Sequence, residues 1–172
     1  MPIISTDIVY RLSGGASNVD PNASLGGARS TAGGGVITTD VLNNVWDNVS
    51  GDDSAAGDTE YRCIYILNNH GSLTLTNPVV WIQSNTANAN TDVNIGLGSS
   101  AVNGTEQTIA NENAAPSAVT FSAAASKGAG IALTSLTFGQ HRAIWIRRIV
   151  TLGASASNND AYTLIVEGET AA

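Results

Sequence analysis

The longest apolar pattern in the chain covers residues 61–83, YRCIYILNNHGSLTLTNPVVWIQ. Two runs rich in aliphatic and aromatic residues flank a polar segment, residues 68–72, in which Gly71 can take the positive φ that a reversal often needs. This arrangement predicts a β-hairpin. Alternate side chains on both faces of the first run are largely apolar, so we expect that strand to lie inside a packed assembly of sheets.

Shorter stretches with apolar residues at alternate positions predict further strands. Val93, Ile95 and Leu97 alternate with Asn94 and Gly96. Comparable patterns occur in residues 7–12, 118–123, 130–136, 140–150 and 161–167. About eight strands separated by turns rich in Gly, Asn and Ser indicate an all-β protein folded as a single β-sandwich.

One segment has helical rather than alternating periodicity. In residues 38–50, TTDVLNNVWDNVS, the apolar residues Val41, Leu42, Val45 and Trp46 fall on one side of a helix. A Thr or Asp at its start supplies an N-cap. We expect one short helix here, with Trp46 closing an open end of the sandwich.

The N-terminal part differs in composition from the rest. Residues 13–35 consist mainly of Gly, Ser, Asn and Ala, which cannot build a core. They are either a mobile loop or an extended arm that becomes ordered against a neighbouring subunit. We therefore divide the chain into residues 1–35, a strand followed by this arm, and residues 36–172, the sandwich, within one domain.

The strand predicted in residues 140–150 concentrates basic residues. If its aliphatic side faces the core, Trp145 and Arg147 lie outside, with Arg142 nearby. Trp and Arg are enriched at the centres of protein interfaces. Arg142, Trp145 and Arg147 are therefore the candidate interface residues. The alternative is that Trp145 is covered by loops of its own chain and the arginines are solvated or paired with carboxylates.

Composition narrows the range of functions. Of 172 residues only 12% are charged, and the formal net charge is −7 with seven Lys and Arg. Nucleic-acid binding needs clustered basic residues, so we expect none. No stretch approaches the roughly 18 apolar residues of a membrane span, and no signal peptide is recognisable at the N-terminus. We expect a protein made in the cytoplasm, without membrane contact.

Little in the sequence indicates chemistry. The two histidines, His70 and His141, belong to no metal or catalytic motif, and Cys63 lies in an apolar strand, as a buried hydrophobe would. Residues 51–60 carry Asp52, Asp53, Asp58 and Glu60, a candidate cation site whose spacing does not match an EF-hand, so that a solvated acidic loop is the better interpretation. We expect no enzyme, no cofactor, no bound metal and no small-molecule substrate.

Four segments together resemble a group of small virion structural proteins of tailed bacteriophages. They are residues 61–83, GQHRAIWIRRIV, NASLGGARS and the C-terminal YTLIVEGET, and the likeness extends over residues 8–169. The resemblance implies an immunoglobulin-like or jelly-roll-like sandwich present in many copies on the particle.

The leading hypothesis is a capsid decoration, or cement, protein on the outer surface of the phage head. Its expected partners are the major capsid protein and copies of itself, as a homotrimer. A tail or baseplate sandwich is the second hypothesis. A carbohydrate-binding module is the third, with Trp46, Trp81 and Trp145 as the aromatic residues that would contact sugar.

Overall fold

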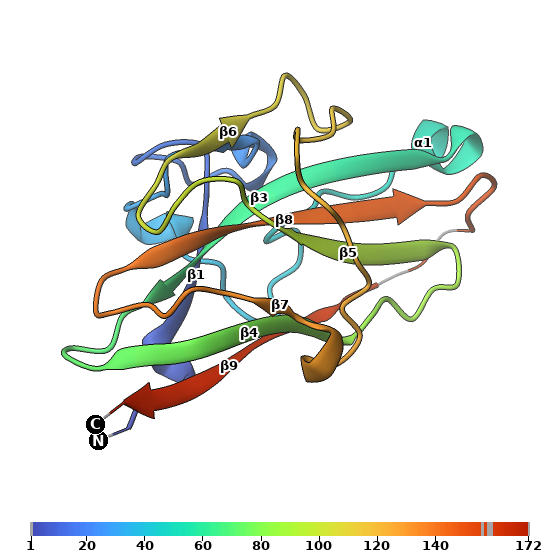
Figure 1. Ribbon diagram of the computed structural model, residues 1–172. Helices are drawn as coiled ribbons and strands as arrows, with labels where there is room; N and C mark the ends of the chain where they lie inside the picture. Colours follow the sequence, from blue (N-terminus) through green and yellow to red (C-terminus); the bar gives the residue numbers. More distant parts are fainter. Residues whose placement is uncertain (1, 156, 158–159, 172) are drawn as a thin grey trace.

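The computed structural model describes residues 2–155, 157 and 160–171 as three antiparallel sheets. The main sheet has the order β1-β3-β8-β5, the facing sheet has the order β7-β4-β9, and β2 pairs with β6 in a small ribbon (Figure 1). The strands are β1 Ile8–Leu12, β2 Gly26–Gly27, β3 Asp58–Asn68, β4 Thr74–Ser84, β5 Thr91–Leu97, β6 Glu106–Thr108, β7 Ile131–Ala132, β8 His141–Val150 and β9 Thr163–Ala171. The predicted all-β sandwich is confirmed.

The core between the two sheets follows from strand periodicity. Ile64 and Ile66 of β3 and Ile144 and Ile146 of β8 project from one face of the main sheet and are completely or almost completely buried. Val80 and Ile82 of β4 belong to the same buried cluster. Because β3 and β8 pair over ten residues, these side chains form a continuous apolar layer.

The opposite face of the main sheet carries a second core. Tyr61, Cys63 and Tyr65 of β3 and Trp145 of β8 are buried there with Ile109. Their cover comes from the segments around residues 25 and 109–121, with β6 above the sheet in Figure 1. Both faces of β3 are therefore covered, as its sequence predicts, although one cover is mostly irregular chain.

The exposed position predicted for Trp145 is wrong, and the alternative, in which loops of its own chain cover it, is the one that the structure bears out. Its side chain is 0% exposed, and Cys63 lies directly across from it in the β3–β8 register. Residues 109–121 bring Val119 and Phe121 onto this face. The expectation failed because it assumed one apolar face for β8, whereas irregular segments cover the other face without any periodic signal in the sequence.

The predicted hairpin of residues 61–83 is also wrong, although both of its strands exist. β3 belongs to the main sheet and β4 to the facing sheet, so the connection crosses from one layer to the other. Asn68 anchors this crossing, because its side-chain Nδ2 donates to the carbonyls of Leu73 at 2.9 Å and Leu136 at 2.8 Å. His70 Nδ1 accepts the N–H groups of residues 72 and 73, which confirms its place in the turn.

Residues 38–50 do not form the predicted helix. Asp40 and Asn43 have φ values of 59° and 58°, which are incompatible with a continuous right-handed helix. Val45 and Trp46 are buried, whereas Val41 and Leu42 are exposed. The α-helix of the described chain is α1, Gly51–Ala56, which begins with a capping box between Ser50 and Asp53.

The predicted extended arm is wrong as well, because residues 13–35 fold onto their own sheet. The Ser30 N–H donates to Leu12 O at 2.8 Å, and the Gly14 N–H donates to Gly26 O at 2.7 Å. A Cβ at Gly26 would lie 1.8 Å from Gln107 O, so only glycine permits this approach. Small residues serve here to bring backbone close to backbone.

Short segments also cover the edges of the main sheet. Beyond the end of β1, the Cys63 N–H donates to Ser24 O at 2.8 Å. On the far edge Ser122 exchanges two backbone hydrogen bonds with Ile95 of β5, at 2.9 and 3.0 Å. That isolated bridge is all that the structure forms of the strand predicted in residues 118–123. Edge groups that could pair with other chains are thereby satisfied internally.

Replacing Trp145 measures how much the second core stabilises the fold. We expect Trp145→Ala to lower the free energy of unfolding by about 3–5 kcal/mol, because it leaves a large cavity under the irregular cover. Phe138→Ala is the matched control, since Phe138 is an exposed aromatic residue. Urea denaturation of both variants checks this, and a loss at Trp145 no larger than that at Phe138 would contradict the second core.

Candidate functional site

A dense group of ionisable side chains lies at the part of the β3 edge that β1 does not pair with. β1 pairs only with residues 64–68 of β3, so residues 58–63 have β8 as their single strand neighbour. Glu60 and Arg62 are two residues apart in this strand, so their side chains project to the same face of the sheet. The Tyr61 N–H donates to Glu112 O at 2.7 Å, which holds the 110–113 loop against the edge.

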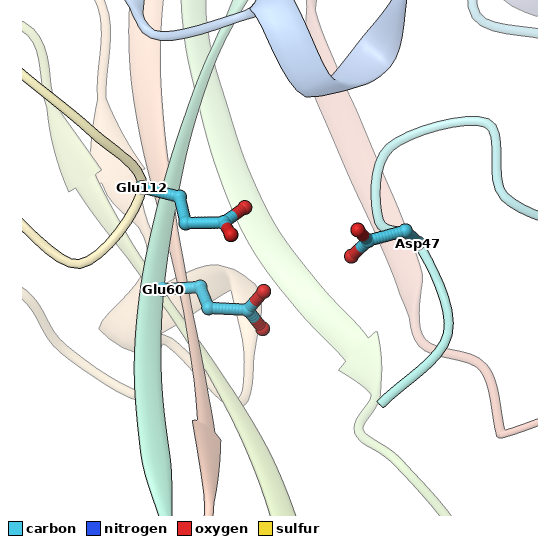
Figure 2. A group of neighbouring side chains, drawn as sticks. All are labelled: Asp47, Glu60 and Glu112. Carbon is cyan, nitrogen blue, oxygen red and sulfur yellow. The ribbon is translucent and has the colours of Figure 1, made fainter. Parts of the chain in front are cut away.

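Three carboxylates converge at this edge. Asp47, Glu60 and Glu112 each place an oxygen within 4.8 Å of the others. Figure 2 shows Glu60 and Glu112 side by side, both directed toward Asp47 on a separate loop. Glu60 is buried, and the other two are partly exposed. No other such group of acidic, His or Cys side chains occurs in the described part of the chain.

Two guanidinium groups neutralise most of this charge. Arg148 Nε donates to Glu60 Oε2 at 2.5 Å, and its Nη2 lies 3.5 Å from Asp47 Oδ1. Arg62 Nη2 donates to Glu112 Oε2 at 2.5 Å. Both guanidinium carbons lie over the Trp46 ring, at 5.2 Å for Arg62 and 4.9 Å for Arg148. The tryptophan therefore contributes a cation–π contact to each arginine.

In this cluster, ion pairing offsets the cost of burying the charged side chains. Burial raises the pKa of Glu60, while the hydrogen bond and charge of Arg148 oppose that rise. Three carboxylates and two guanidinium groups leave a formal charge of −1. Removal of either arginine would leave a carboxylate without its main counter-charge in a partly dry site.

This geometry favours a structural clamp over a metal centre. A hard cation would have to displace two guanidinium groups that already bind the carboxylate oxygens. The clamp joins β3 and β8 to the loops that carry Asp47 and Glu112. An open groove of about 310 Å³ lies beside it, lined by Asn22, Leu25, Asp47, Ala110, Asn111, Glu112 and Asn113.

The cation candidate of residues 51–60 does not assemble. Asp53 caps α1, and Asp58 Oδ1 accepts from Asn113 Nδ2 at 2.6 Å. Only Glu60 of the four predicted ligands joins the carboxylate group, together with Asp47 and Glu112. The sequence offered one signal for the real cluster, because Glu60, Arg62 and Arg148 are charges set inside apolar strands of a charge-poor chain.

The predicted interface residues do not form one surface. Trp145 is buried in the second core. Arg147 lies 5.0 Å over the Phe121 ring and donates to the side chain of Asn94, whereas Arg142 donates to Gly98 O at 3.1 Å. Strand alternation places the two arginines on opposite faces of β8. Both are partly exposed, and their role as contact residues stays a prediction.

All three tryptophans are inaccessible to a flat ligand. Trp46, Trp81 and Trp145 are 8%, 9% and 0% exposed. Sugar-binding platforms need exposed aromatic faces, so the proposed tryptophan platform is wrong. Cys63 is fully buried, as predicted, and burial raises the pKa of its thiol.

Glu106 holds a second loop on the outer face. Its carboxylate accepts from Ser99 Oγ at 2.7 Å and from the Ser100 N–H at 2.9 Å, and its own N–H donates to Tyr65 Oη at 3.0 Å. Burial tends to raise the pKa of this carboxyl, but the serine hydrogen bonds outweigh it and lower the pKa to about 2. The ionised form is therefore the one that the fold stabilises.

Comparison with protein-family models, with curated proteins and with solved structures finds no match for this chain. Within the described residues, no helix has the length and apolar character needed to cross a membrane.

Removal of Arg148 tests the clamp. We expect Arg148→Met to lower the free energy of unfolding by about 3–5 kcal/mol at neutral pH, because Glu60 loses the charge that opposes its burial. Lys127→Met breaks the exposed pair with Glu167 and should cost at most about 1 kcal/mol. Urea denaturation measures both variants. Equal losses of unfolding free energy would contradict the clamp, because the buried pair would then stabilise the fold no more than the exposed one.

The lowered pKa of Glu106 predicts that the stability of the fold depends on pH in the acid range. Its pKa is lowered by folding, so its stabilising contribution is complete above the unfolded pKa near 4.5 and disappears as the pH falls toward 2. Glu106→Gln should therefore be less stable than wild type at pH 7, with the difference shrinking over this range. Thermal unfolding at successive pH values measures it, and a difference that does not change with pH would contradict the assignment.

Proposed function

We propose that this chain is a non-enzymatic structural protein of tailed-phage virions, and specifically a decoration protein on the outer surface of the head. The observation that carries the proposal is the internal use of its buried charge. Glu60, Arg62, Glu106 and Arg148 are each bound by other groups of the same chain. Such pairing leaves no free acid, base or nucleophile among these four residues for a reaction.

The surface composition supports a role in a lattice. The loops that connect the strands are rich in Gly, Ser, Thr, Asn and Ala, and charged residues are 12% of the chain. Small neutral side chains lose little conformational entropy and little hydration energy when a neighbour covers them. The likeness to small virion structural proteins agrees with this use.

The expected partners are the major capsid protein and copies of the chain in a homotrimer. Residues 13–35 are held on their own sheet and Trp145 is buried, so the segment is no free arm and Trp145 is no exposed contact residue. In this proposal the folded surface makes the contact, with Arg142 and Arg147 as the remaining candidates from the basic strand. The protein reaches the virion after synthesis in the host cytoplasm.

Copy number on the particle tests this function. We expect hundreds of copies per virion, recovered with heads when heads and tails are separated, as measured by quantitative mass spectrometry against the major capsid protein. Recovery with tails would favour the tail or baseplate alternative. A few copies per particle would contradict a lattice protein, since decoration repeats with the lattice.

A further inference from the structure

Two arginines meet on the outer face of the main sheet, at the end of β3 away from the clamp. Arg11 of β1 lies directly across from Tyr65 in the β1–β3 register. Its Nε donates to Ser30 O at 2.8 Å and its Nη2 donates to Ala32 O at 2.5 Å. Arg29 Nη1 also reaches Ser30 O, at 3.4 Å. The two guanidinium groups therefore converge on a single carbonyl oxygen.

Neither of these arginines has a counter-charge in the described structure. The four salt bridges of the described structure involve Arg62, Lys127 and Arg148. No carboxylate described there lies within salt-bridge distance of Arg11 or Arg29. Acidic residues outnumber Lys and Arg by 14 to 7, so suitable partners are not scarce. Arg11 is only 9% exposed, and a cation that is both buried and unpaired is costly.

The neighbouring groups described on this face form no ion pair with either arginine. The His141 ring packs edge-on against Tyr65 with centroids 5.1 Å apart. His141 Nδ1 and Arg29 Nε are buried atoms without a hydrogen-bond partner among the described residues. Burial and the charge of Arg29 lower the pKa of His141 to about 4, and burial together with Arg29 lowers the pKa of Arg11. The nearby carboxylate of Glu106 is bound by Ser99 and Ser100.

We propose that Arg11 and Arg29 form a binding site for one oxyanion, a carboxylate or a phosphate group. A guanidinium group presents paired N–H donors that match two oxygens of such an anion. Arg11 is held in place by two carbonyls, and the more exposed Arg29 supplies the second set of donors. One bound anion would offset the repulsion between the two cations and the burial of Arg11. The site is independent of the proposed virion function.

Thermal unfolding in the presence of simple oxyanions tests the site. Wild type, Arg29→Gln and Arg147→Gln are compared in sodium phosphate and in sodium succinate, with ionic strength held constant by sodium chloride. Arg147 is the matched control because it too has no carboxylate partner among the residues that the structure describes, but lies over Phe121. Arg29→Gln should fold, since the side chain is partly exposed and its hydrogen bond is long.

We expect the Tm of wild type and of Arg147→Gln to rise by roughly 3–6 °C per tenfold increase in anion once the site is mostly filled. Arg29→Gln should lose this rise. A larger effect of phosphate would identify a phosphate group as the ligand, and a larger effect of succinate would identify a carboxylate. Absence of this rise in wild type, or an equal rise in Arg29→Gln, would overturn the site.

Discussion

The fold depends on covering both faces of the main sheet. β3 and β8 carry large apolar side chains on each face, so one layer of facing strands cannot exclude water from all of them. The facing sheet covers the aliphatic side. The side with Tyr65, Cys63 and Trp145 needs a second cover, which the irregular segments around residues 13–35 and 98–122 provide (Figure 1).

An irregular cover buries backbone N–H and C=O groups that have no strand partner, and leaving such groups without hydrogen bonds is costly. The chain solves it with small residues that let backbones approach, as at Gly26, and with side-chain amides that replace backbone partners. Asn18 Nδ2, for example, donates to Ser13 O at 2.6 Å. Abundant Gly, Ser and Asn, which look like signs of a flexible arm, are in this fold the residues that make dense loop packing feasible. The charged clamp fixes the loop of Asp47 to the same sheet through Arg148, and the part of the cover that carries Glu112 through Arg62.

Alternation in the sequence located the long strands, because the period of two survives wherever one face is apolar. It does not identify their partners, so the sequence predicts a hairpin of β3 and β4, whereas the chain crosses at Asn68 into the other sheet. The helix predicted in residues 38–50 is wrong because positive φ at Asp40 and Asn43 divides the segment. The sequence does not predict the whole clamp, because Asp47 and Glu112 come from loops whose approach to the main sheet depends on tertiary hydrogen bonds. Glu60, Arg62 and Arg148 alone carried a signal, as charges within apolar strands.

The glycine-rich N-terminal segment is an integral cover of the isolated chain. Amide hydrogen exchange of the purified protein tests this most directly, at the N–H groups of Gly14, Ser30 and Ile109, which donate to Gly26, Leu12 and Leu25. The structure predicts that these amides exchange far more slowly than unfolded chain, in step with those of β3. Exchange of all three at the rate of unfolded chain, while β3 stays protected, would contradict it.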